Sequence, residues 1–228
     1  IEAPADCREE TGNREESPRY KEGGKKEVTI RAVFFDLGGV IVRTEYQAPR
    51  QRLAEQFGMD YEDIEKLVFG GGSNSSAARA SVGEITEQEH WLNVMKALKL
   101  PASDVARVRN EFFGGDIIDR NLLEFMRTLK PKRKVGAISN AWDGLRAYME
   151  REKFADVFDS IVISAEVKVA KPAEKIYRIA LEQLQVKPKE AVFVDDMPAN
   201  IEACEKLGMK GIQFTDAESA LKQLKALL

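Results

Sequence analysis

The chain has 228 residues, 43% of them hydrophobic, and a formal net charge of −3. This length allows one large α/β domain, or a core domain with a smaller second domain. The weak negative charge argues against nucleic acid or an anionic membrane as the main partner, because both attract basic surfaces. No apolar run approaches the ~18 residues that a membrane-spanning helix needs.

Cysteine usage and the N-terminal region bear on location. Cys7 and Cys204 lie far apart and indicate neither a disulfide framework nor a zinc site. The first residues lack the apolar segment of a signal peptide. We therefore expect a cytoplasmic protein. We also expect it to be either a monomer or a homodimer.

Residues 1–27 differ in composition from the rest of the chain. Fourteen of these 27 residues are charged, and few are apolar. Such a segment cannot bury enough apolar surface to offset the entropy lost on ordering. We predict a disordered tail, or residues left over from expression, outside the folded domain.

From residue 28 onward, short apolar segments alternate with helical patterns. The expected strands are rich in Val, Ile or Phe, as buried parallel strands are: residues 28–35, 134–139, 160–164, 191–195 and 210–214. The expected helices cover residues 116–130, 142–153, 172–185, 198–207 and 216–228, with Pro172 and Pro198 in first turns. The alternation predicts a Rossmann-like three-layer α/β fold with a parallel sheet.

Residues 47–115 break this alternation with several helical segments and no convincing strand. One helix begins at a capping-box pattern, Thr86 to Glu89. We predict a small helical cap domain at 47–115 above an α/β core domain formed by 28–46 and 116–228.

Polar residues follow several of the expected strands. In an open parallel sheet the ligand binds outside the carboxyl ends of the strands. Carboxylates suit Mg²⁺ there, and ammonium, hydroxyl and amide donors suit phosphate oxygens. The sequence therefore predicts a site for a phosphate with a divalent cation. Its candidate residues are Asp36, Ser139, Asn140, Lys171, Asp195 and Asp196.

Four short motifs, in this order, resemble those of the haloacid dehalogenase superfamily over roughly residues 28–228: Asp36–Val40, Ile138–Asn140, Lys171-Pro172 and Val192–Asp196. The insertion after the first motif is similar to the type-one helical cap of that superfamily. Gly83–Thr86 and Asp195–Met209 also resemble the phosphatase domain of soluble epoxide hydrolases and bacterial sugar-phosphate phosphatases.

The resemblance implies a nucleophile and a metal site. Asp36 would attack a phosphoryl group and form an aspartyl-phosphate that water hydrolyses. Mg²⁺ would be held by the Asp36 carboxylate, the Gly38 carbonyl and Asp196, with Asp195 in support.

The resemblance also implies how the phosphate is held. Lys171 would neutralise Asp36 and the transferring phosphoryl group. Ser139 and Asn140 would bind phosphate oxygens, and the backbone amides after Asp36 would add donors.

Gly38 departs from the pattern of the superfamily. Most of its phosphatases carry Asp at this position, as acid for the leaving group and base for the water. Gly38 keeps the backbone carbonyl but loses that proton shuttle, which is worth roughly 10²–10⁴-fold in rate. Three explanations stay open: another group or water moves the proton, the leaving group needs none, or turnover is slow and the protein mainly binds.

The predicted function is a Mg²⁺-dependent phosphatase acting on a small phosphorylated metabolite. A metal-independent 2-haloacid dehalogenase, in which Asp36 attacks carbon, is an alternative that the acidic pair Asp195-Asp196 disfavours. The second alternative is a catalytically weak protein that binds a metabolite. Trp142, close to Asn140, could line the substrate pocket or serve packing alone.

Overall fold

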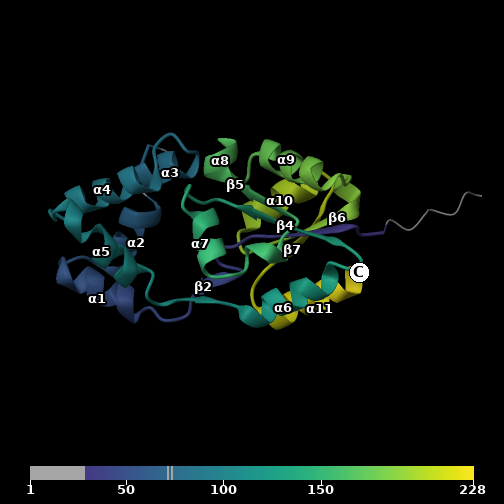
Figure 1. The fold of residues 1–228 in the computed structure, drawn as a ribbon, viewed down its shortest axis with the longest axis horizontal. Helices are drawn as coiled ribbons and strands as arrows, with labels where there is room; N and C mark the ends of the chain where they lie inside the picture. Colours follow the sequence, from purple (N-terminus) through teal and green to yellow (C-terminus); the bar gives the residue numbers. More distant parts are fainter. Residues whose placement is uncertain (1–28, 71, 73) are drawn as a thin grey trace, which may run out of the picture.

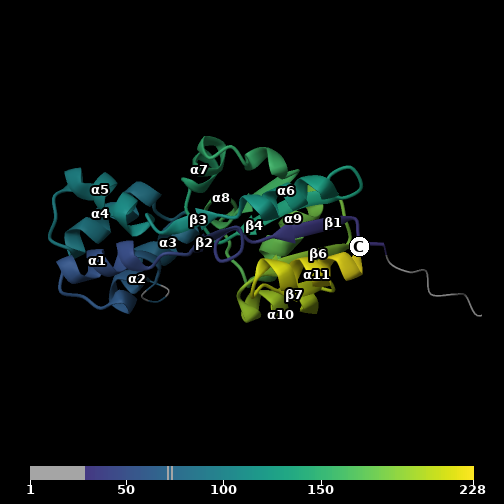
Figure 2. The ribbon, with the colours of Figure 1, turned by 90° about the horizontal axis from the view of Figure 1, so that it is seen from below.

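The computed structural model describes residues 29–70, 72 and 74–228, whose course can be followed in Figures 1 and 2. The predicted tail at 1–27 lies outside the described residues, as does Cys7.

Five parallel strands form the central sheet in the order β5-β4-β1-β6-β7, which confirms the predicted α/β fold. Their bounds are β1 (Ala32–Phe35), β4 (Lys134–Ser139), β5 (Ser160–Ile163), β6 (Ala191–Asp195) and β7 (Lys210–Gln213). The central strand β1 pairs Phe35 with Ala137 on one side and with Val194 on the other. The ends of β1, β4 and β6 therefore meet at one edge of the sheet, where the strand order reverses.

Helices cover both faces of this sheet, because successive side chains of a strand point to opposite faces. Val33 and Phe35 of β1 pack into one cluster, and Ala32 and Phe34 pack into the other. The first cluster is covered by α6 (Arg120–Leu129), α7 (Leu145–Arg151) and α11 (Ala217–Leu227). The second is covered by α9 (Glu174–Leu184) and α10 (Pro198–Lys206), on the other side of the sheet in Figure 1. Shorter elements are η2 (Ala155–Val157), α8 (Ser164–Val167) and η3 (Pro188–Glu190).

A helical block lies beyond the carboxyl ends of the strands, on the left of Figures 1 and 2. It has its own hydrophobic cluster around the buried Trp91. The capping box predicted at Thr86 and Glu89 is present and begins α4. The division into a core domain and a cap domain at 47–115 remains a prediction. The helices are α1 (Ala48–Gln56), α2 (Tyr61–Phe69), α3 (Ser76–Ser81), α4 (Glu87–Ala97), η1 (Ala102–Asp104) and α5 (Val105–Phe112).

Two short antiparallel strands, β2 (Val42–Thr44) and β3 (Asp116–Ile118), connect the block to the sheet (Figure 2). The prediction of a helix from residue 116 is wrong at its start, because 116–118 pair with β2. The side chain of Asp119 accepts a hydrogen bond from Leu122 N at 2.8 Å and caps α6. The helix therefore begins at Arg120.

The structure confirms the expected place of Pro198 and contradicts that of Pro172. Pro198 is the first residue of α10, as expected. Pro172 follows a cis peptide bond and lies before α9, which begins at Glu174. Gly208 follows α10 with a φ of +95°, the left-handed conformation that suits glycine after a helix.

Candidate active site

Asp36 lies directly after the central strand. Its backbone N–H donates to Val194 O at 2.9 Å and so extends the pairing with β6 by one residue. The side chain is buried, and its Oδ1 accepts a hydrogen bond from Leu37 N at 2.7 Å. The sheet thus holds this carboxylate at the edge where ligands bind in such folds.

A tight turn follows Asp36 and leaves Gly38 outside its hydrogen bonds. Gly39 N donates to Val42 O at 3.0 Å, and Val42 N donates to Leu37 O at 2.8 Å. Neither bond involves Gly38, so these turn hydrogen bonds do not use its carbonyl oxygen. Gly39 has a φ of +76°, which an L side chain rarely adopts.

The buried ammonium of Lys171 lies between two carboxylates. Its Nζ is 2.8 Å from Asp36 Oδ2 and 2.7 Å from Asp195 Oδ2, and its side chain has no exposed surface. Opposite charges at this distance in a buried site interact strongly, because little solvent screens them. The predicted lysine therefore contacts the predicted nucleophile directly.

Asn140 holds the backbone of Lys171. Its Oδ1 accepts from Lys171 N at 2.7 Å, and its Nδ2 donates to Lys171 O at 2.9 Å. The amide nitrogen of Asn140 carries a second hydrogen, which these contacts leave for a ligand. Ser139, the last residue of β4, is buried beside it. The predicted phosphate contacts of Ser139 and Asn140 remain predictions.

Both carboxylate oxygens of Asp195 accept hydrogen bonds from neighbouring groups. Its Oδ1 accepts from Met197 N at 2.8 Å and from Asn200 Nδ2 at 2.9 Å. Asn200 Nδ2 also lies 3.1 Å from Oδ2, the oxygen that binds Lys171. Asp195 is thereby oriented to hold Lys171. Its predicted supporting role at a Mg²⁺ ion remains a prediction.

Asn200 was missing from the predicted set of site residues. Its backbone carbonyl accepts a hydrogen bond from the buried hydroxyl of Tyr177 at 3.0 Å. The available signal was an amide residue in the first turn of a helix that begins just after two aspartates. From there its side chain reaches back to Asp195.

One carboxylate oxygen of each of Asp36, Asp195 and Asp196 lies within 4.8 Å of the other two. Burial raises the pKa of Asp36 to about 6, with the charge of Asp195 adding to the shift and Lys171 opposing it. Burial, together with the charge of Asp195, also raises the pKa of Asp196. Three carboxylates face one ammonium, so a divalent cation with oxygen ligands would balance their charge. The donor set therefore fits Mg²⁺.

Gly39 makes room for the carboxylate of Asp196. A Cβ at position 39 would overlap both carboxylate oxygens of Asp196, whereas a Cβ at position 38 would meet no atom within 4 Å. We expect Gly39→Ala to displace Asp196 and weaken Mg²⁺ binding, measured by calorimetry, by at least about tenfold. Gly38→Ala is the matched control and should bind Mg²⁺ like the wild type. Equal affinity in both variants would show that Asp196 is not a ligand.

Trp142 joins the loop after Asn140 to the helical block. Its indole Nε1 donates to Ala77 O at 3.4 Å, and its ring centroid lies 4.5 Å from that of the buried His90. The ring of Phe69 stacks on it with centroids 6.1 Å apart. Trp142 thus packs against the block, whatever its role toward a substrate.

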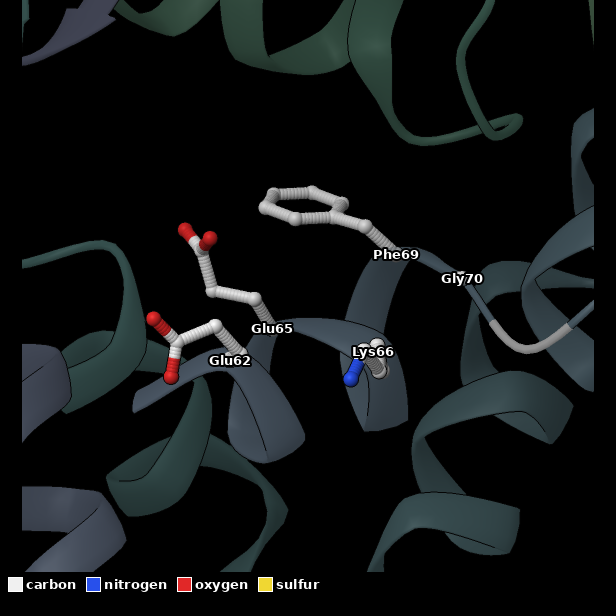
Figure 3. A pocket seen from close by; sticks show the side chains of 5 residues that line it. All are labelled: Glu62, Glu65, Lys66, Phe69 and Gly70. Atoms are coloured by element: carbon white, nitrogen blue, oxygen red, sulfur yellow. The ribbon is translucent and has the colours of Figure 1, made fainter. Parts of the chain in front are cut away.

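A shallow hollow of about 330 Å³ runs along α2, where Figure 3 shows the side chains of Glu65 and Phe69 standing above the helix. None of the predicted site residues lines it. Its lining residues are Glu62, Glu65, Lys66, Phe69 and Gly70.

Two polar contacts dock the helical block on the core. Glu87 N, at the start of α4, donates to Asp143 Oδ1 at 2.9 Å. Lys168 Nζ donates to Gly83 O at 2.7 Å. Both core residues lie in segments that neighbour the site, Asp143 after Asn140 and Lys168 before Lys171.

Within the described part of the chain, no helix combines the length and the apolar character needed to cross a bilayer.

Two known proteins are similar in sequence to this chain over most of its length. The chain is 29% identical over 216 residues to bifunctional epoxide hydrolase 2 of Sus scrofa, which covers 87% of this chain and 39% of that protein. The chain thus spans well under half the length of this relative. It is 27% identical over 196 residues to the phosphorylated carbohydrates phosphatase of Thermotoga maritima, covering 80% of this chain and 84% of the relative.

One solved structure is similar to this chain in fold, and one family model matches its sequence. A HAD family enzyme from Bacteroides thetaiotaomicron, in complex with magnesium and inorganic phosphate, has a TM-score of 0.68 at 22% identity, covering 84% of this chain and 98% of that one. At this identity the likeness concerns the fold. The model described as haloacid dehalogenase-like hydrolase matches residues 30–208. The match includes the four short motifs at 36–40, 138–140, 171–172 and 192–196, and the chain belongs to the haloacid dehalogenase-like hydrolases.

Proposed function

We propose that this hydrolase is a Mg²⁺-dependent phosphatase that cleaves a small phosphorylated metabolite through an aspartyl-phosphate on Asp36. One observation carries the proposal: the buried ammonium of Lys171 lies between Asp36 and Asp195 at the end of the central strand, beside Asp196. A strongly anionic site with one fixed cation suits a metal-bound phosphate better than a neutral substrate.

Asp36 acts as the nucleophile in this mechanism. A carboxylate oxygen attacks phosphorus, and the bond to the leaving oxygen breaks with its electron pair. Lys171 keeps Asp36 ionised and balances the charge of the phosphoryl group. Water then attacks phosphorus, and the electron pair of the Asp36–phosphorus bond returns to the carboxylate.

The remaining site residues bind and orient. Ser139, the free amide hydrogen of Asn140 and the backbone amides after Asp36 hold phosphate oxygens. Asp36, the Gly38 carbonyl and Asp196 would hold Mg²⁺, with Asp195 in support. When bound, the metal ion supplies charge neutralisation for the phosphoryl oxygens.

We assign the helical block at 47–115 the role of a cap over this site. Its contacts to the core, through Gly83 and Glu87, reach the segments that carry Lys171 and Asn140. A cap in this place would exclude water and contact the leaving group. The name of the Thermotoga maritima relative supports a phosphorylated small molecule as substrate.

A panel of phosphate esters, assayed with and without Mg²⁺, tests the proposed function. We expect release of inorganic phosphate from at least one ester in Mg²⁺, and none in excess chelator. Halide release from a 2-chloroacid without added metal would instead support attack on carbon. Tight metabolite binding by calorimetry, with no phosphate released from any ester, would support a binding protein.

A further inference from the structure

Gly38 leaves an open position beside the proposed nucleophile. The residue is exposed, and a Cβ built on it would meet no heavy atom within 4 Å. Its backbone angle is not in the left-handed region, so an ordinary side chain fits here without strain. Two residues earlier, Asp36 lies buried on Lys171. The position is therefore accessible to substrate and water but carries no functional group.

The acidic and basic groups that the described residues place beside Asp36 are already engaged with one another. Among the described histidine, cysteine, aspartate and glutamate residues, the acidic cluster contains Asp36, Asp195 and Asp196 alone. The ammonium of Lys171 is bonded to two of these carboxylates and is fully buried. Asp195 accepts hydrogen bonds on both oxygens. Neither Lys171 nor Asp195 is therefore free to give a proton to a leaving oxygen, and position 38 has no side chain to do so.

We propose that the site selects phosphates whose leaving group is stable as an anion, namely phosphates on an acyl or an anomeric oxygen. This inference rests on the proposed phosphatase function and narrows its substrate class. An ordinary alkoxide is a strong base, and its departure without general-acid help is slow. A carboxylate is a much weaker base and carries the electron pair away unaided, and an anomeric oxygen is a weaker base than an ordinary alkoxide and so needs less help.

The first step needs no proton transfer. The Asp36 oxygen forms a bond to phosphorus, the phosphorus–oxygen bond to the leaving group breaks, and the leaving group takes the electron pair as an anion. In the second step, water forms a bond to phosphorus and loses a proton to solvent, and Asp36 recovers its electron pair. Neither step needs an acid or a base from the protein.

The second step should then limit turnover. Because position 38 offers no base to the attacking water, the aspartyl-phosphate forms rapidly from a good leaving group and hydrolyses slowly. All good substrates share this intermediate, so their kcat values should converge. The first turnover should release the leaving group in a burst.

A series of aryl phosphates with phenols of graded acidity tests the proposal. In the wild type, kcat/KM should fall steeply as the phenol becomes less acidic. Gly38→Asp should flatten this dependence and raise the rate on an alkyl phosphate by about 10²–10⁴-fold, the usual contribution of general acid–base catalysis. Gly38→Asn matches Asp in size and Gly38→Ala adds only a methyl group, so both controls should keep the steep dependence.

A shallow dependence in the wild type would overturn the proposal, as would a Gly38→Asp variant that accelerates every ester equally. Both results leave the phosphatase function standing, because phosphate is still released. If no ester releases phosphate, the proposed function fails and the selectivity falls with it. The wild-type slope decides the matter even if the Gly38→Asp variant folds poorly.

Discussion

Replacing Asp36 by Asn is expected to reduce phosphate release by about 10⁴-fold or more, the scale seen when a catalytic nucleophile is removed. The amide has nearly the shape of the carboxylate but neither its charge nor its nucleophilicity. Phosphate release in Mg²⁺ is the measurement. Glu202→Gln, an exposed change of the same kind on the neighbouring α10, is the control and should keep full activity.

The Asp36→Asn variant should remain folded. The pKa of Asp36 is raised from 3.8 to about 6, mainly by burial, so ionising this group opposes folding as pH rises through that interval. Above pH 6 and without metal, Asp36→Asn should therefore be at least as stable as the wild type in thermal unfolding. A variant that keeps its activity would remove Asp36 from the mechanism. A variant that is inactive and unfolded would contradict this account of its charge.

Replacing Lys171 by Met should lower the free energy of unfolding by about 3–5 kcal/mol, because it removes one partner of a buried ion pair. The ammonium contacts Asp36 and Asp195, which would face each other without a counter-charge. Activity should be lost as well. Denaturant unfolding without metal measures the change in stability.

Repeating the unfolding measurement in Mg²⁺ tests the same buried network. A divalent cation held by the acidic cluster replaces part of the missing positive charge, so it should stabilise Lys171→Met more than the wild type. Lys175→Met, an exposed change on α9, is the matched control and should alter neither stability nor activity. A loss of less than about 1 kcal/mol in Lys171→Met, the scale of an exposed pair, would contradict the buried network.

The strands that carry the site could be predicted because their pattern is local. The apolar segments ending at Phe35, Ser139 and Asp195 each read as a strand buried on both faces, and the structure places strand ends there. The rule that ligands bind at the carboxyl ends of such strands then brought the motif residues together. The capping box at Thr86 is local in the same sense.

Features that depend on distant pairing could not be predicted. Val42 pairs with Ile118, and nothing in either segment alone distinguishes this pairing from a helix start. The Asn140 side chain binds the backbone of Lys171, 31 residues away. The close approach of Gly39 to Asp196 depends on the β1–β6 pairing. Each of these three features depends on how distant segments pack together, which no single segment of the sequence shows.

The most direct test of the central claim is a covalent one. Wild-type protein is mixed with a reactive acyl or aryl phosphate in Mg²⁺, quenched in acid within the first turnover, and digested for mass spectrometry. The account predicts a phosphoryl group on the peptide that carries Asp36, absent in excess chelator and in Asp36→Asn. Phosphate release without an adduct on that peptide, or with the adduct on another residue, would contradict it.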